Sequence, residues 1–148
     1  MTQSNSSNRG PVTIADAAVM ALAKASYEHC RVAPDFFPAF YRAFLATCPE
    51  AAPLFAHTDF AKQNNLLRHA VGLLLIFPNQ PAGEPTLLSR LAERHSRRDL
   101  KIDPALYAPF IDSLIATVRR FDSEFTPATE AAWRATVRMG VEYMRAKY

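Results

Sequence analysis

Hydrophobic residues recur along most of the chain at the spacing of an α-helix. Between Phe37 and Leu45 the apolar side chains stand three, four, seven and eight positions after the first, which places them on one helical face. Comparable stripes occupy residues 13–30, 60–77, 86–95, 104–121 and 127–144. No segment of adequate length alternates with the period of two that a half-buried strand shows. The pattern therefore predicts an all-α fold of about seven helices.

Proline and small polar residues mark the ends of these helical segments. A side-chain oxygen suited to capping a helix N-terminus precedes five of the patterns, at Asp35, Asp59, Thr86, Asp103 and Thr126. Proline follows directly after Asp103 and Thr126, where the first helical position tolerates it. Pro49 and Pro53 bracket a short helical turn that ends near Phe55. We expect the helices to begin at these residues.

The length and composition fit one globular domain. The chain has 148 residues, of which 49% are hydrophobic and 21% are charged, and its formal net charge is +3. These values exclude disorder as the main state. Abundant alanine and only 4 glycines agree with helices rather than sheets. We expect a single domain over residues 13–148, preceded by a polar, disordered tail over residues 1–12.

Charge and hydropathy exclude several kinds of partner. No run of five or more Lys and Arg occurs, so nucleic-acid binding has little electrostatic support. The longest apolar run, 71–77, is too short to cross a bilayer, so no membrane association is expected. Residues 1–10 lack the apolar core of a secretory signal peptide. The chain has two cysteines, Cys30 and Cys48, and two cysteines cannot form a disulfide framework. We therefore expect a cytoplasmic protein with reduced thiols, and no pattern specifies its oligomeric state.

Three polar residues interrupt otherwise apolar helix stripes. His95 follows Leu91 by one helical turn, Tyr41 stands among phenylalanines, and Gln63 precedes Leu67 by one turn. Taken singly, each can be an ordinary residue: a core histidine bonded to a backbone carbonyl, a core tyrosine and a half-exposed glutamine. Taken together, an imidazole and two hydrogen-bond donors amid aromatic side chains match the needs of a buried flat cofactor, with the imidazole as ligand of a haem iron.

The other histidines give weaker signals. His29 ends the first helical segment, His57 lies in a loop, and His69 is rotated away from the stripe of Gln63. We expect all three at the surface, with His29 complementing the partial negative charge at the helix C-terminus. The sequence has no HExxH motif and no glycine-rich phosphate loop, so neither a zinc hydrolase nor a nucleotide-binding protein is supported.

The order and spacing of several motifs resemble the globin family, in particular bacterial single-domain globins and the haem domain of flavohaemoglobins. The resemblance extends over residues 14–144 and rests on Phe40-Tyr41-Arg42-Ala43-Phe44 with Pro49-Glu50 and Leu54-Phe55, Gln63-Asn64-Asn65-Leu66-Leu67, Leu91-Ala92-Glu93-Arg94-His95 with Leu100, Ile102, Pro104 and Tyr107, and Trp133. It implies a globin fold, with its helices arranged around a pocket for haem b.

The resemblance also implies roles for single residues on both sides of such a haem. His95 would be the proximal ligand of the iron. Tyr41 and Gln63 would form a distal pair that donates hydrogen bonds to a bound gas. Phe55 would stack on the porphyrin, and Leu67 would wall the distal pocket.

Three further residues belong to the proximal side in this resemblance. Leu91 stands in the helix of His95, and Tyr107 stands at the start of the next helix. Arg94 would pair with a haem propionate, a role that Arg97 and Arg98 share as candidates. The alternative for these arginines is a solvated basic stretch.

The chain departs from the flavohaemoglobin pattern in three respects. That family places a glutamate late in the last helix, where it bonds the proximal histidine, and here Glu142 is out of register. The stretch from Phe55 to Gln63 is shorter than in that family, and the stretch from His95 to Tyr107 is longer. No flavin or NAD domain follows, so we expect any electrons to come from a separate reductase.

Three functions follow from the resemblance. The first is reversible binding of O2, and of other diatomic gases such as NO and CO, at a pentacoordinate iron. The second is NO dioxygenation, which needs the reductase partner and lacks the electron push of the missing glutamate. The third is a gas sensor or a globin-fold module without haem. Against a sensor, such a protein needs an output domain. Against a module without haem, such a protein would not need Tyr41, Gln63 and His95 to converge. We expect an oxygen-binding carrier rather than an enzyme.

Overall fold

The computed structural model describes residues 14–81 and 83–148, which form six α-helices and three short 3-10 helices. The α-helices are α1 (Ile14–Arg31), α2 (Phe36–Thr47), α3 (Phe60–Ile76), α4 (Ser89–His95), α5 (Tyr107–Phe121) and α6 (Pro127–Ala146), and the 3-10 helices are η1 (Pro49–Phe55), η2 (Phe77–Asn79) and η3 (Pro104–Leu106). This part of the chain contains no strand, so the predicted all-α fold is confirmed. None of its helices is long and apolar enough to cross a membrane. The predicted tail over residues 1–12 lies outside the described residues.

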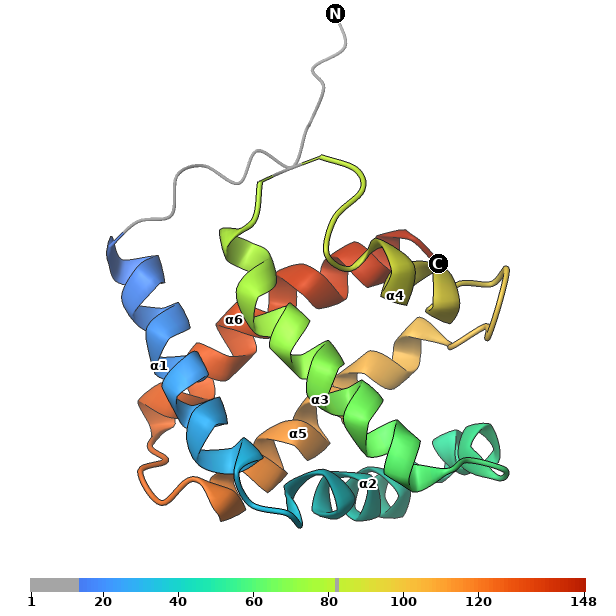
Figure 1. Cartoon of the computed structure of the whole chain (residues 1–148), viewed down its shortest axis with the longest axis horizontal. Helices are drawn as coiled ribbons and strands as arrows, with labels where there is room; N and C mark the ends of the chain where they lie inside the picture. The colour runs from blue at the N-terminus through green and yellow to red at the C-terminus, as the bar shows by residue number, and fades with distance from the viewer. Residues whose placement is uncertain (1–13, 82) are drawn as a thin grey trace, which may run out of the picture.

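The helices cross one another in two directions (Figure 1). In this view α3 lies across the front of the molecule, while α5 and α6 cross behind it. Helix α1 packs on α6, α2 packs on α5, and α4 packs on α6 near the C-terminal end of the chain. As a result α4 and η1 lie on the same side of α3, with η1 joined to the end of α2.

Aromatic rings join α2 to α5. The ring centroids of Phe40 and Phe44 on α2 lie 5.0 and 6.0 Å from that of Phe110 on α5. Nearer the start of α2, Phe36 packs edge-on against Phe121 at 5.7 Å. The three rings of α2 are buried, and buried aromatic side chains contribute large apolar areas to a core. This contact fixes the position of α2 within the fold.

Helix α6 is tied to the helices on both sides of it. Trp133 is fully buried, and its Nε1 donates a hydrogen bond of 2.9 Å to Oγ of Ser26 on α1. Further along α6, a Cβ atom at Gly140 would lie 2.6 Å from Cδ2 of Leu74 and 2.8 Å from Cδ1 of Leu88. The missing side chain therefore permits the close approach of α6 to α3 and to the residue that precedes α4.

Three of the predicted helix caps use their side chains as expected. Asp59 and Asp103 each accept a hydrogen bond from a backbone N–H in the following turn. Thr126 forms a capping box with Thr129, in which each hydroxyl accepts a hydrogen bond from the other residue's backbone N–H. The segment after Asp103 begins as η3 and continues directly as α5, so its predicted start is also confirmed.

Two predicted caps differ from expectation. Asp35 makes no capping hydrogen bond, and its carboxylate instead pairs with the guanidinium of Arg42 at 2.7 Å. Thr86 does accept a hydrogen bond from the backbone N–H of Leu88, but α4 begins only at Ser89. Asp35 thus occupies the N-cap position of α2 as predicted, but its carboxylate does not cap, because it pairs with Arg42 two helical turns further along the chain.

The two kinds of cap give a matched pair of stability predictions. Thr126→Ala removes the hydroxyl that satisfies the N–H of Thr129, and we expect it to lower the free energy of unfolding by about 1 kcal/mol. Asp35→Ala removes only an exposed ion pair, so its expected effect stays within about 0.5 kcal/mol. Urea unfolding followed by circular dichroism measures both. Equal losses in the two variants would contradict the assignment of the capping box.

Candidate functional site

Tyr41 and Gln63, which lie on different helices, form a hydrogen-bonded pair. The Nε2 atom of Gln63 on α3 donates to the hydroxyl oxygen of Tyr41 on α2 at 2.9 Å. Tyr41 is buried with 5% of its surface exposed, whereas Gln63 is half-buried. Since the tyrosine oxygen accepts from Gln63, its own hydrogen is left to donate to a third group. The structure thus brings together the two polar residues that the sequence singled out.

Aromatic rings surround the hydroxyl-bearing ring of Tyr41. Its centroid lies 5.1 Å from that of Phe40, 5.5 Å from that of Phe55 and 5.4 Å from that of Phe60. Burial raises the pKa of Tyr41 to about 12, against the smaller opposing effect of the hydrogen bond from Gln63. Tyr41 is therefore fully protonated at neutral pH and can act as a donor.

Two apolar residues complete this side of the candidate site. Phe55 ends η1, is half-buried, and packs on both Tyr41 and Phe60. Leu67 is buried on α3, one helical turn after Gln63. They give the polar pair a largely apolar surrounding, in which a hydrogen bond is stronger than it is in water.

His95 is the last residue of α4 and is half-buried. Its Nδ1 lies 2.8 Å from the backbone oxygen of Leu91, one turn earlier, so Nδ1 carries the hydrogen and donates. Burial lowers the pKa of His95, against a smaller raising effect of that hydrogen bond, and favours the neutral imidazole. No group among the described residues bonds Nε2, whose lone pair is left available. The bond to Leu91 is the one expected of an ordinary core histidine, and it also leaves a nitrogen that can ligate a metal.

The remaining residues of the predicted proximal side lie in different environments. Tyr107 is buried at the start of α5, and the guanidinium carbon of Arg145 lies 5.9 Å from its ring centroid. Arg94 is exposed and pairs with Asp99 at 3.2 Å. Glu142 is also exposed and pairs with Arg145 at 3.5 Å, so its carboxylate is engaged away from the imidazole of α4.

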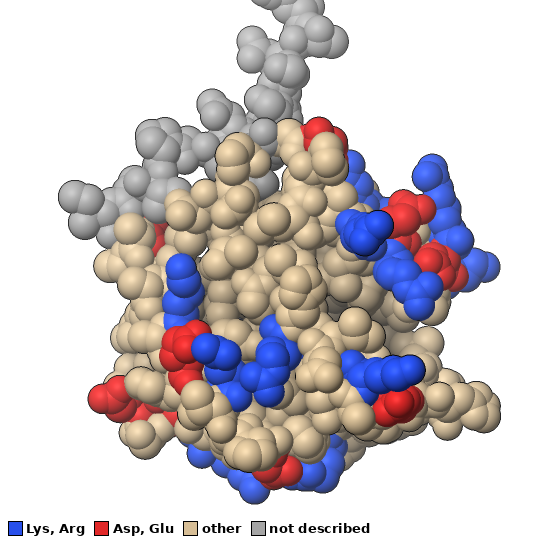
Figure 2. All heavy atoms as spheres, in the orientation of Figure 1, with Lys and Arg blue, Asp and Glu red and all other residues tan. Residues whose placement is uncertain are grey.

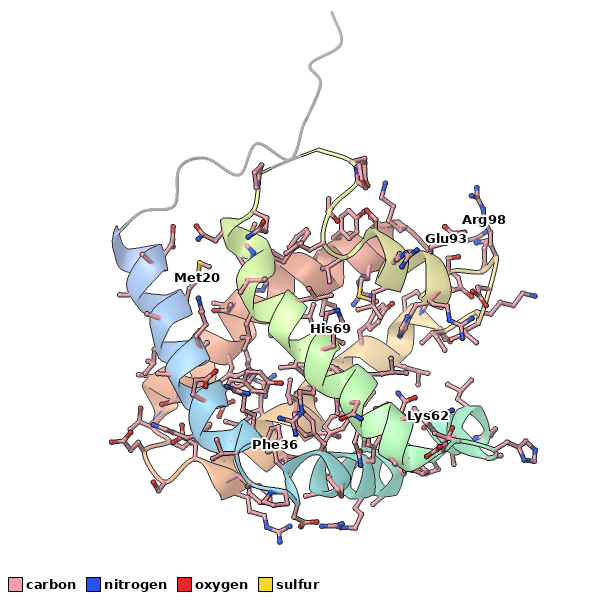
Figure 3. All side chains as sticks on the ribbon, in the orientation of Figure 1. Met20, Phe36, Lys62, His69, Glu93 and Arg98 are labelled. Carbon is pink, nitrogen blue, oxygen red and sulfur yellow. The ribbon has the colours of Figure 1, made fainter. Side chains whose placement is uncertain are left out.

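Arg97 and Arg98 line a surface pocket between the segment after α4 and the last turns of α6. Arg98 points outward from this segment in Figure 3. The pairing of any of the three arginines with a propionate stays a prediction.

The other histidines lie at the surface, as expected. His57 and His69 are exposed, and Figure 3 shows His69 on α3. His29 is exposed at the end of α1, but it also has partners that the sequence did not indicate. Its Nδ1 lies 2.9 Å from the carboxylate of Asp122, and its Nε2 lies 3.3 Å from that of Glu124. The three residues thus bind the end of α1 to the turn between α5 and α6.

The ion pair of His29 makes stability depend on pH. The hydrogen bond to Asp122 raises the pKa of His29 above its ordinary value of 6.5. The protonated ring is then favoured in the folded state, and its contribution is fully present below pH 6.5 and lost as the pH rises through the raised pKa.

We therefore expect His29→Gln to flatten the decrease in the urea midpoint as the pH rises above 6.5. The matched control is His57→Gln, which removes an exposed imidazole for which the described residues provide no carboxylate partner. An unchanged pH profile in His29→Gln would show that the pair with Asp122 contributes nothing to stability.

His95 on α4 and the Tyr41–Gln63 pair of α2 and α3 have the chemistry that a haem requires. A neutral imidazole with an unbonded nitrogen is a standard axial ligand, and the protonated phenol and the amide are donors without negative charge. The outline of the molecule is indented between the segment around α4 and the segment around η1, the elements that carry His95 and Phe55 (Figure 2). The set can hold an iron from one side and offer hydrogen bonds to a small polar ligand from the other.

A family model described as Globin matches residues 38–142, and the chain belongs to the globin family. This range contains Tyr41, Phe55, Gln63, Leu67 and His95. Because the family and the fold imply haem as the cofactor, the protein is a haem globin that binds gas.

A solved structure refines the comparison. The protein PA3967 from Pseudomonas aeruginosa PAO1, described as structurally highly homologous to a human haemoglobin, superimposes with a TM-score of 0.82 at 32% sequence identity. The match covers 88% of this chain and 98% of that chain. The resemblance to a bacterial globin that the sequence motifs indicated is thus confirmed. No curated protein matches the chain.

Proposed function

We propose that this protein binds O2 reversibly at a pentacoordinate haem b held by His95. The observation that carries the proposal is the pairing of the Tyr41 hydroxyl with Gln63, in a chain whose His95 keeps one imidazole nitrogen unbonded. When bound, haem supplies a ferrous iron with one open position for a diatomic gas. The residues on either side of it decide which gas is retained.

On the proximal side His95 supplies Nε2, and its orientation is set by the bond from Nδ1 to the Leu91 carbonyl. Arg94 is the residue that would pair with a haem propionate, and its exposed ion pair with Asp99 would then break. Tyr107 is buried at the start of α5 and would contribute apolar surface on this side.

On the distal side Tyr41 and Gln63 can each donate a hydrogen bond to a polar gas ligand. Each such bond contributes about 1 kcal/mol net, so two would slow dissociation of O2 by about ten- to a hundred-fold. Phe55 would stack on the porphyrin, and Leu67 would exclude water from the pocket. CO accepts hydrogen bonds poorly, so the same pair discriminates in favour of O2.

NO dioxygenation is the alternative that the Tyr41–Gln63 pair also permits, with a separate reductase as partner. The partner of Nδ1 weighs against it. That partner is the neutral carbonyl of Leu91, whereas a carboxylate would increase the electron donation of the imidazole. We therefore rank reversible binding above an oxygen-consuming reaction and above sensing.

Visible absorption spectra of the ferric, ferrous and CO-bound protein test the proposal. The expected ferrous spectrum is that of a five-coordinate b-type haem, which converts completely on addition of CO. An O2 equilibrium curve and an assay of NO consumption with a flavin reductase then separate a carrier from a dioxygenase. A six-coordinate low-spin ferrous spectrum before any gas is added would overturn the pentacoordinate assignment.

A further inference from the structure

A second pocket lies on the outer side of α4, away from the candidate haem site. It has a volume of about 540 Å³ and is formed by α4, the segment after it, residue 84 and the last turns of α6. The charged and aromatic residues used below are Glu84, Glu93, Arg97, Arg98, Tyr143 and Lys147. Glu93 and Arg98 lie close together at this edge of the molecule in Figure 3. The volume falls within the range of small-molecule sites and far exceeds that of a single inorganic ion.

Two arginine side chains in this pocket, Arg97 and Arg98, pair with no Asp or Glu side chain among the described residues. The Nε atom of Arg97 donates to the backbone oxygen of Tyr148 at 3.0 Å, and its guanidinium lies over the Tyr148 ring at 5.0 Å. These contacts orient Arg97 while leaving its terminal nitrogens unbonded. Arg98 follows directly and is exposed. Other arginines of α4 and α6 do pair with carboxylates, namely Arg94, Arg134 and Arg145.

The pocket also contains oriented acceptors. Glu84 pairs with Lys147 at 3.0 Å and accepts hydrogen bonds from the hydroxyls of Tyr143 and Ser89. This network fixes Glu84 and neutralises its charge. Glu93 lines the pocket and has no cation as partner among the described residues. The lining thus combines two guanidinium groups that pair with no Asp or Glu side chain with two carboxylates.

These groups define the chemistry of a ligand that would match them. A neutral sugar would leave both guanidinium groups without an anion. Inorganic phosphate would satisfy the guanidinium groups but would leave most of the volume empty and would offer Glu93 no hydroxyl group of a sugar or polyol. A phosphate monoester carries about −1.5 to −2 charges at pH 7, which equals the combined charge of two arginines. Hydroxyl groups on the same molecule would donate to the acceptors.

We propose that the pocket binds a small phosphorylated sugar or polyol, with its phosphate on Arg97 and Arg98 and its hydroxyl groups on Glu93 and Glu84. The site requires neither haem nor gas, so it is independent of the function proposed above.

Calorimetric titration of the haem-loaded full chain tests the site with three probes: glucose 6-phosphate, glucose and inorganic phosphate. We expect glucose 6-phosphate to bind at least about tenfold more tightly than phosphate, and glucose to show no binding. Arg98→Gln should weaken glucose 6-phosphate by about tenfold or more, the effect of losing a charge-assisted hydrogen bond. Arg90→Gln is the matched control, because Arg90 is exposed on α4 but does not line the pocket.

Each outcome decides the proposal. Equal affinity for phosphate and glucose 6-phosphate would overturn the recognition of hydroxyl groups, and equal losses in Arg98→Gln and Arg90→Gln would overturn the site. Absence of heat with every probe up to about 10 mM would also overturn it, since this exceeds the usual affinity range for such metabolites. The haem spectrum of each variant, expected to stay unchanged, shows that a loss of binding does not arise from unfolding.

Discussion

Replacing His95 by alanine should abolish the five-coordinate ferrous spectrum and reduce CO binding to background. The other imidazoles have different surroundings, because His57 and His69 are exposed and His29 is held in the ion pair with Asp122. Absorption spectra of the ferrous and CO-bound forms measure the effect. Added free imidazole should restore part of the spectrum, because it can occupy the space left by the side chain and ligate the iron from the same side.

The control for this experiment is His69→Ala, which removes an exposed imidazole from α3. We expect its spectra and CO binding to match those of the unmodified protein. If His95→Ala retained an unchanged Soret band and full CO binding, the assignment of the iron ligand would be wrong. Restoration by imidazole distinguishes loss of a ligand from collapse of the fold.

Tyr41→Phe should raise the dissociation rate of O2 by about tenfold or more, with a much smaller effect on CO. The substitution keeps the ring that packs on Phe40, Phe55 and Phe60 and removes only the hydroxyl. It also leaves the amide of Gln63 without its present acceptor. Stopped-flow replacement of O2 by CO, and of CO by NO, gives the two rates.

Tyr27→Phe provides a matched control for the loss of a buried tyrosine hydroxyl. The hydroxyl of Tyr27 donates to the backbone oxygen of Arg68 at 2.9 Å, and its ring packs on Phe37 and Trp133, apart from the candidate site. We expect Tyr27→Phe to lower stability without changing either gas rate. Small, equal changes in the O2 and CO rates of Tyr41→Phe would make Tyr41 an ordinary core residue.

Local chemistry explains which parts of the structure could be predicted from the sequence. Asp59 and Thr126 cap helices because the N–H groups they satisfy lie within the next few residues. The contact of His95 with Leu91 follows from the spacing of one helical turn. Tyr41 and Gln63 could be singled out because each is polar on an apolar stripe, and the globin resemblance indicated that they converge.

Contacts between distant segments account for what the sequence did not reveal. Asp122 lies 93 positions after His29, and nothing near either residue indicates that the two meet. The contact of Arg97 with Tyr148 likewise depends on where α6 ends relative to α4. Asp35 shows the opposite case, in which a local rule predicted a cap and Arg42 took the carboxylate.

The absence of a side chain at Gly140 on α6 allows Leu88, the residue directly before α4, to pack closely against α6. Leu88, whose Cδ1 would meet a side chain there, is buried and lies two helical turns before His95. A methyl group at 140 would meet Leu74 of α3 as well as Leu88, so both leucine side chains would have to move. Helix α3 carries Gln63 and Leu67, and Leu88 directly precedes the helix that ends at His95. One position on α6 therefore couples the spacing of α3 and α4, the helices that carry residues from both sides of the candidate haem site.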